Sequence, residues 1–434
     1  MGVLLADILR DRLTATPAGR RLCDAVDERG WWAAAGMAWR AAYLLRLMRW
    51  PRAGRAERRA LAAVLRGGQW GGYPYPGPRT ARFIQAFARL HAVPHVIAAS
   101  SGATALMAAF QSLQLLPGDE VLVPAITFSA SATAAQILGL RALFVDVDPE
   151  TLCIDPRLVE TAITPRTRAI VAVHMGDELC DMDALCGIAE RRGLSIVEDC
   201  AHAHGAAWRG RPVGGIGNVG CFSFQGQKLL SAGEGGAIVT SDPHVAAACA
   251  AAIDCGRTHG TLPDQSCLGI NLRMTEMQAA LLCCALQRFE REQLLRTSRM
   301  ERLRDRLSGV DGIRLPRRDP RMTARPTFGF QLLFDADRCG GVPRSRFIAD
   351  LTHAGFPAWE PLYGPVYLAR EYGRLDPRMP GGLDAVRCPT AESLTTRSLV
   401  WFPHPFFLGA QRHVDRLADT IATLVTRYQH GLAG

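Results

Sequence analysis

The stretch from Phe222 to Gly236 reads FSFQGQKLLSAGEGG, and it contains Lys228, the only lysine among 434 residues. The apolar run Gly220–Phe224 at its start is typical of a buried strand. Glycines follow the lysine, and glycine permits tight turns and close approach of the backbone to a ligand. The stretch therefore predicts a strand that ends in a loop carrying one amine.

The amine is chemically distinct from every other cation in the chain. Lysine and arginine total 50, so arginine supplies all the other basic side chains. A guanidinium is effectively never deprotonated, whereas a desolvated lysine with a lowered pKa can attack an aldehyde. Composition alone leaves open that a single lysine was kept by chance, and the residues around Lys228 must decide.

Outward from this stretch, the chain alternates short apolar runs with helical patterns between about residues 80 and 300. The expected strands are His95–Ala99, Glu120–Pro124, Ala142–Val147, Ala169–Val173, Ser195–Glu198, Gly220–Phe224 and Ala237–Thr240. Alternation of strands and helices predicts an α/β fold with a mostly parallel sheet of about seven strands.

The rest of the chain predicts flanking units. An Arg-rich helix over Met277–Leu307 leads into a proline-rich segment, which indicates a smaller C-terminal α+β domain. We expect a helical N-terminal extension in residues 1–50, a large domain in 51–300 and a small domain in 301–434. The extension could pack on the body, lie on a membrane surface or meet a partner, and packing on the body is favoured.

Two further motifs stand at expected strand ends. SSGATA, Ser100–Ala105, opens a helix after a strand, where free N–H groups and the helix dipole favour an anion. SIVEDCAHAHG, Ser195–Gly205, places Asp199 at the carboxyl end of a buried strand, where open α/β sheets bind ligands. Cys200, His202 and His204 could suggest a metal, but no further ligand cluster is evident, and no metal is predicted.

Together these motifs resemble the DegT/StrS family of sugar and cyclitol aminotransferases over roughly residues 65–430. The matching segments, in order, are SSGATAL, PAITFSASA, FVDVDPETLCIDP, EDCAHAHGA, FSFQGQK with GEGG, and GINLRMTEMQAA. The resemblance implies the type I aminotransferase fold, pyridoxal 5'-phosphate as cofactor, and catalysis by Lys228, Asp199 and His202.

The resemblance also assigns a role to each residue of the site. Lys228 would hold the cofactor as a Schiff base, Asp199 would keep its pyridine nitrogen protonated, and His202 would hydrogen-bond its phenolic oxygen. The remaining contacts would be Phe128 stacking on the ring, Gly102, Ala103 and Ser223 on the phosphate, and Asn271 on the phosphate of the neighbouring subunit. The role of Asn271 implies a homodimer with shared active sites.

The sequence departs from the family pattern at two places. Ala103 stands where threonine is usual, so backbone N–H groups or Thr104 would have to replace one phosphate contact. Gly176-Asp177, followed by Glu178, stands where Tyr-Gly is usual, and this bears on contacts to the substrate.

Composition narrows the setting of the protein. No uncharged apolar stretch reaches the 18 residues that a membrane span needs, and the N-terminus does not read as a secretory signal, so we expect a cytoplasmic protein. Thirteen cysteines without framework spacing are expected to be reduced. The net charge of +9 is concentrated in residues 1–68, which hold 13 arginines and 6 acidic residues. Because no nucleic-acid-binding signature accompanies this charge, no nucleic-acid partner is predicted.

The function implied is transfer of an amino group from glutamine or glutamate to a ketone. FSFQ before the lysine, WGG at Trp70 and the late FPHPFFLG resemble family members that act on keto-cyclitols, or 3-amino-5-hydroxybenzoate synthases, more than nucleotide-sugar enzymes. A keto-cyclitol or keto-sugar acceptor in secondary metabolism is favoured. Two alternatives stay open: an aromatising dehydratase like 3-amino-5-hydroxybenzoate synthase, and a non-catalytic partner or regulatory protein of the same fold.

Overall fold

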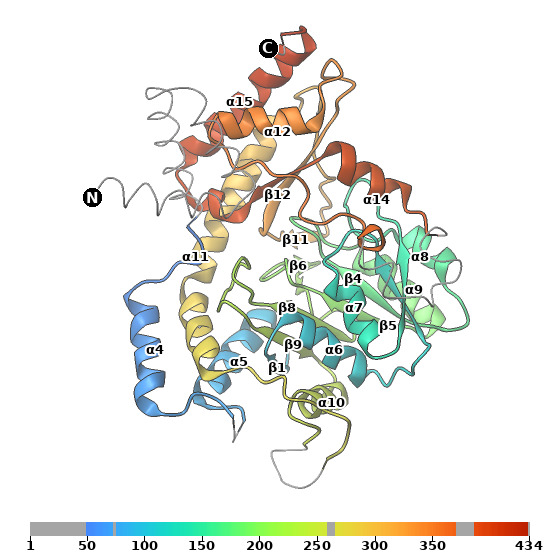
Figure 1. The fold of residues 1–434 in the computed structure, drawn as a ribbon, viewed down its shortest axis with the longest axis vertical. Helices are drawn as coiled ribbons and strands as arrows, with labels where there is room; N and C mark the ends of the chain where they lie inside the picture. Colours follow the sequence, from blue (N-terminus) through green and yellow to red (C-terminus); the bar gives the residue numbers. More distant parts are fainter. Residues whose placement is uncertain (1–48, 73–74, 258–264, 370–385, 433–434) are drawn as a thin grey trace.

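The computed structural model describes residues 49–72, 75–257, 265–369 and 386–432, and its centre is a seven-stranded sheet (Figure 1). The strands lie in the order β1-β9-β8-β5-β4-β2-β3. They are β1 (His95–Ala99), β2 (Glu120–Pro124), β3 (Arg141–Val145), β4 (Thr167–Val173), β5 (Ser195–Asp199), β8 (Val219–Ser223) and β9 (Gly236–Thr240). Only β9 runs antiparallel to its neighbours in this sheet, so the expected mostly parallel α/β architecture is confirmed.

Helices connect and cover these strands. The helices are α4 (Arg55–Gly67), α5 (Pro78–His91), α6 (Gly102–Ser112), α7 (Ala130–Ile137), α8 (Pro156–Ala162), α9 (Met182–Arg192), α10 (Pro243–Ile253), α11 (Glu276–Leu307), α12 (Arg344–His353), α14 (Pro389–Ser393) and α15 (Gln411–Gln429). Short helical turns occupy η1 (Val366–Leu368), η3 (Leu394–Ser398) and η4 (His404–Leu408).

The strands β2, β8 and β9 are buried at every position, which explains their continuous apolar sequences.

One buried carboxylate joins the start of α5 to the start of α11. Glu276 accepts hydrogen bonds from the backbone N–H groups of Arg79 (2.7 Å) and Thr80 (2.9 Å), which the first turn of α5 cannot satisfy internally. Thr275 caps α11 through the N–H of Gln278. These caps fix α5 and α11 against each other beside the sheet.

The strand register gathers the expected site at one edge of the sheet. Ala99 and Ser223 both pair with Gly236, and Asp199 pairs with Cys221 one strand away. The start of α6, the end of β5 and the end of β8 therefore meet where the parallel strands reach their carboxyl ends.

A second hydrophobic cluster lies above the sheet in Figure 1, around α12 and α15. It includes the antiparallel sheet of β10 (Ile313–Arg314), β12 (Gly329–Phe334) and β13 (Leu399–Pro403). A further small sheet joins β11 (Met322–Ala324) to β6 (Ala207–Trp208) and β7 (Arg211–Pro212).

The helix α11 belongs to both clusters. Phe289 packs with the large cluster, and Met300, Leu303 and Leu307 pack with the second. A division of the chain at residue 300 stays a prediction, and it would fall inside this continuous helix. The expected N-terminal extension lies outside the described residues apart from its last two. Among the described residues, no helix has the length and apolar character needed to cross a membrane.

Candidate active site

Lys228 lies in the loop between β8 and β9, with its side chain 8% exposed. Its Nζ atom stands 4.5 Å from the centre of the Phe328 ring. Its backbone is held on both sides: the N–H donates to Gln225 O (2.8 Å), and the carbonyl accepts from Trp50 Nε1 (3.0 Å). Burial lowers the pKa of Lys228 to about 8, against an opposing attraction from Asp199, so a sizeable fraction of the amine is a free base near neutrality.

Asp199 ends strand β5 and is almost fully buried. One carboxylate oxygen accepts from Ser131 Oγ (2.7 Å), which in turn lies 2.7 Å from Thr127 Oγ1. The other accepts from the N–H of Ala201 (3.1 Å). Because a carboxylate can accept about four hydrogen bonds, these two contacts orient Asp199 and leave acceptor capacity for a ligand.

His202 is buried in a stack of rings. It lies parallel to Phe328 at 3.9 Å between ring centres, and its Nε2 is 3.3 Å from the hydroxyl of Tyr363. Burial, reinforced by the positive charge of Lys228, depresses the pKa of His202 well below its usual value, so the ring is neutral. Phe328 thus lies beside both His202 and the amine of Lys228.

The start of α6 forms a cradle of backbone N–H groups against Ser223. A Cβ atom at Gly102 would lie 2.7 Å from the Ser223 Cβ, so only glycine allows this close approach. Gly102 and Ala103 hold the first N–H groups of the helix, which have no acceptor within it. Thr104 does not compensate for the alanine, because its hydroxyl donates to Ser101 O (2.9 Å) in the capping box. Backbone N–H groups and one serine hydroxyl therefore line a candidate anion site.

Two expected contact residues are at the surface of the described chain. Phe128 is 57% exposed, and its ring centre lies 5.8 Å from that of Tyr363, at the side of the His202 stack. Asn271 is exposed, and its side-chain oxygen accepts weakly from the N–H of Arg273 (3.4 Å). The structure thus brings Lys228 and Asp199 together, while the trans contact of Asn271 stays a prediction.

Comparisons with known proteins identify the family of the chain. The sequence profile of the DegT/DnrJ/EryC1/StrS aminotransferase family matches residues 51–421. The chain belongs to this family. A relative in Streptoalloteichus tenebrarius, L-glutamine:2-deoxy-scyllo-inosose aminotransferase, is 36% identical over 404 residues, covering 87% of this chain and 94% of the relative. The 3-amino-5-hydroxybenzoate synthase of Amycolatopsis mediterranei is 34% identical over 383 residues, covering 87% and 97%.

Solved structures give the same fold. The crystal structure of 3-amino-5-hydroxybenzoic acid synthase has a TM-score of 0.79 at 33% identity, covering 87% of this chain and 98% of that one. The DesV protein of S. venezuelae, in complex with a ketimine intermediate, has a TM-score of 0.76 at 33% identity, covering 86% and 94%. The protein is a pyridoxal-phosphate-dependent aminotransferase of this family.

The residues present fit this cofactor. An aldehyde needs a free amine, which Lys228 offers with its pKa near 8. A phosphate needs N–H donors in a cradle without Cβ atoms, which Gly102 provides beside Ser223. A protonated ring nitrogen needs a carboxylate with spare acceptor capacity, which Asp199 retains.

Four residues around Lys228 and Asp199 received no role from the sequence. Trp50 and His404 hold the lysine loop, since Trp50 donates to Lys228 O and His404 Nε2 lies 2.9 Å from Gln227 O. Ser131 lies in the matched PAITFSASA segment, and His404 in FPHPFFLG, so a signal for both was present. Tyr363 occupies no such motif, and only the folded chain brings it to His202.

The histidines near Cys200 do not form a metal cluster. His204 packs among Phe222 and Phe224 rather than facing His202. Within the described ranges, one group of potential ligands is close enough to bind an ion: His174, Glu198 and Cys200. The oxygens of Glu198 already accept from His174 Nε2 and three backbone N–H groups, so this group is a hydrogen-bonded core element.

Proposed function

We propose that this enzyme transfers the amino group of glutamine or glutamate to a keto-cyclitol or keto-sugar in antibiotic or other secondary metabolism, in the cytoplasm. The single observation that carries the chemistry is the buried amine of Lys228 beside Asp199 at the sheet edge. The names of the relatives support the acceptor class, because several are glutamine:scyllo-inosose aminotransferases.

The chain's own residues account for the proton transfers. When bound, pyridoxal phosphate supplies an aldehyde carbon and a ring that delocalises negative charge. The freed amine of Lys228 acts as the base that moves a proton from the α-carbon of the amino donor. Asp199 holds a negative charge beside the ring nitrogen, and His202 donates a hydrogen bond towards the phenolic oxygen.

Binding roles follow from the same geometry. The N–H groups of Gly102 and Ala103 and the hydroxyl of Ser223 hold the phosphate, with the helix dipole of α6 favouring its charge. Phe128, exposed in one chain, covers one face of the ring. No role for a nucleic acid follows from any of these features.

We further propose a homodimer in which Asn271 contacts the phosphate bound by the partner chain. The exposure of Asn271 and of its neighbours Leu268 (95% exposed) and Ile270 (57% exposed) supports an interface there. Co-expression of a Lys228→Ala chain and an Asn271→Asp chain, each inactive alone, tests this arrangement. A shared site predicts about one working site per mixed dimer, and an inactive mixed dimer would contradict the trans contact.

The 3-amino-5-hydroxybenzoate synthase relative favours a second candidate, an aromatising dehydratase. Both candidates use the same lysine chemistry, but only the second yields an aromatic product. The ultraviolet spectrum of the product therefore separates them.

The decisive experiment is a panel of keto-cyclitols and keto-sugars, each assayed with glutamine and with glutamate. We expect conversion of a keto-cyclitol or keto-sugar to its amine, with the loss of the donor's amino group matched to product. Formation of an aromatic product, with no amination of any ketone in the panel, would favour the dehydratase.

A further inference from the structure

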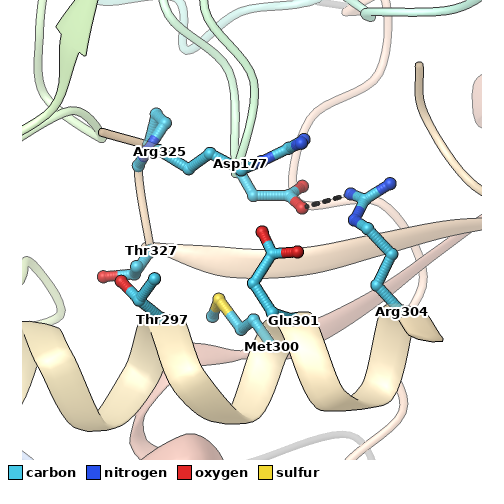
Figure 2. A pocket seen from close by; sticks show the side chains of 8 residues that line it. Asp177, Thr297, Met300, Glu301, Arg304, Arg325 and Thr327 are labelled. Carbon is cyan, nitrogen blue, oxygen red and sulfur yellow. Dashed lines mark hydrogen bonds and ion pairs between the residues drawn. The ribbon is translucent and has the colours of Figure 1, made fainter. Parts of the chain in front are cut away.

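The segment after β4 carries two adjacent buried acids, Asp177 and Glu178, that pair with arginines. Asp177 and Glu178 are 3% and 0% exposed. Asp177 pairs with Arg304 of α11 at 3.1 Å (Figure 2), while Glu178 contacts Arg325, which precedes β12. These acids stand in the segment where the sequence analysis noted a departure from the family pattern.

The ion pairs tie this segment to two other elements. Arg304 also lies 3.7 Å from Glu178 and donates to Pro316 O (2.8 Å), so one guanidinium contacts both acids. Burial raises the pKa of both carboxyl groups, and Arg304 and Arg325 oppose that shift. Buried charges are tolerated only when paired, so the four side chains hold one another in place.

The residue before these acids must be glycine. Gly176 has φ +67°, and a Cβ there would lie 2.0 Å from the side-chain amide of Gln331. The Gln331 amide is oriented so that its nitrogen donates hydrogen bonds to Asp177 Oδ1 (3.1 Å) and Met175 O (3.2 Å). The side chain of Gln331 and the two acids therefore restrict the backbone of Gly176 to one position.

In that position the N–H of Gly176 donates to Nδ1 of His202 at 3.3 Å. A nitrogen that accepts a hydrogen bond carries no proton, so the proton of the neutral ring is on Nε2. Nε2 faces the Tyr363 hydroxyl at the site, 3.3 Å away. The backbone of Gly176 thus sets which edge of His202 is a donor.

We propose that Asp177 and Glu178, anchored by Arg304 and Arg325, are positioning residues that hold Gly176 against His202 and so keep His202 as an Nε2–H donor. The inference rests on the proposed function, in which that donor faces the phenolic oxygen of the cofactor. It assigns a role to acids at the position where this chain departs from its family.

The first test compares Glu178→Gln and Asp177→Asn with the parent in full-length, cofactor-loaded enzyme. Each variant removes one carboxylate charge from the cluster of two acids and two arginines, and so loosens Gly176. Because a hydrogen bond favours the charged form of its acceptor, loss of the His202 donor should raise the pH midpoint of the cofactor's visible absorption by about half a unit or more. Turnover should fall about 3- to 10-fold, with the KM for the amino donor little changed.

The matched control is Glu120→Gln. Glu120 is also buried and paired with an arginine, Arg141, but it begins β2 at the opposite end of the sheet from the site. We expect its absorption midpoint to equal that of the parent. An equal shift in all three variants would reveal a general loss of stability and overturn the positioning role.

A double-mutant cycle with His202→Gln separates positioning from folding. Glutamine places an amide nitrogen near Nε2 and has no ring tautomer to be set, so the absorption midpoint of this variant should no longer depend on the position of Gly176. Glu178→Gln should then add no further midpoint shift in the His202→Gln background. Additive shifts would overturn the proposal. The absorption readout needs no ketone, so failure of the proposed acceptor would be seen separately.

Discussion

Two carboxylates that are neighbours on β5, Glu198 and Asp199, have opposite surroundings. Successive residues of a strand face opposite sides of a sheet. Glu198 accepts from the N–H groups of Gly214, Ile216 and Gly217 at 2.6–2.8 Å, and from His174 Nε2 at 3.3 Å. Its acceptor capacity is fully used inside the protein.

Asp199 accepts only from Ser131 Oγ and the N–H of Ala201 among the contacts described above, and its charge acts on Lys228. Burial favours the protonated form of Glu198, but the hydrogen bonds from His174 and the glycine loop hold its pKa below the usual value. The comparison shows that burial alone does not distinguish a structural acid from a functional one. The two acids differ instead in how much of their hydrogen-bond acceptor capacity is left unused.

The largest loss of turnover should come from replacing Lys228, whose amine is attracted by Asp199. Lys228→Ala should lose turnover by several orders of magnitude, since the side chain supplies both the imine-forming amine and the base. Lys228→Arg is the control that keeps the charge but cannot deprotonate. Borohydride treatment of the cofactor-loaded parent should attach the cofactor to the Lys228 peptide, and labelling elsewhere would contradict the central assignment.

Asp199→Asn should come second. The amide keeps the shape but removes the charge expected beside the ring nitrogen, so about 4 kcal/mol of stabilisation and roughly 10³-fold in turnover are at stake. Steady-state kinetics on the loaded enzyme measure this loss. Near-normal turnover would mean that the role of Asp199 is wrongly assigned.

In contrast to Asp199→Asn, Glu198→Gln should lower the stability of the fold while turnover per folded molecule stays nearly unchanged. An amide would turn N–H groups towards the N–H donors of the Gly214–Gly217 loop, and each buried donor left without an acceptor costs about 1–3 kcal/mol. Urea unfolding measures this, with the half-exposed Glu160 changed to Gln as a surface control.

The same variant has a pH signature. Because the folded pKa of Glu198 is lowered, its contribution to stability is present above its ordinary value of 4.5 and is lost as the pH falls through the folded value. The parent and Glu198→Gln should therefore converge in stability under acid. A constant difference across pH would show that the cost lies in packing rather than charge.

Much of the fold could be predicted from local pattern. The short apolar runs within His95–Ala99 and Glu120–Pro124 predicted β1 and β2 to the residue. Pro94 and Ser100 flank β1, and Asp119 precedes β2 while Pro124 ends it. The strand expected over Ala142–Val147 instead ends at Val145, and Val147 forms a separate bridge with Ile154. Strands of two residues, such as β6 and β7, have no periodicity to detect.

The site residues that lie within sequence motifs could be predicted. Contacts between segments that are far apart in the sequence could not. Asp199 ends β5 and Lys228 lies in the loop that follows β8, both within marked motifs, so their meeting follows from two adjacent parallel strands. Tyr363 reaches His202 across 161 residues, and Trp50 reaches Lys228 across 178. No spacing rule predicts such contacts, whereas the choice of Asp199 over Glu198 was made from its place in the EDCAHAHGA segment at the strand end.

The smallest expected effect is on the pH dependence of the Lys228 amine, and it tests most directly which carboxylate, Asp199 or Glu198, acts on that amine. Only the free amine adds to an aldehyde, and the pKa of Lys228 is about 8, with Asp199 raising it against the effect of burial. In cofactor-free enzyme, reductive methylation of Lys228 by formaldehyde should therefore be about a tenth as fast at pH 7 as at its plateau above pH 9. Mass spectrometry can follow this cleanly, because the chain has one lysine.

Changing each carboxylate then shows which of the two the amine senses. Asp199→Asn removes the attraction that favours the charged amine, so the midpoint should move downward, on the order of half a pH unit. Glu198→Gln should leave the midpoint in place, because its charge is held by the Gly214–Gly217 loop and His174. Equal midpoints in the two variants would show that the amine does not distinguish them. The contrast between the two faces of β5 would then not extend to Lys228.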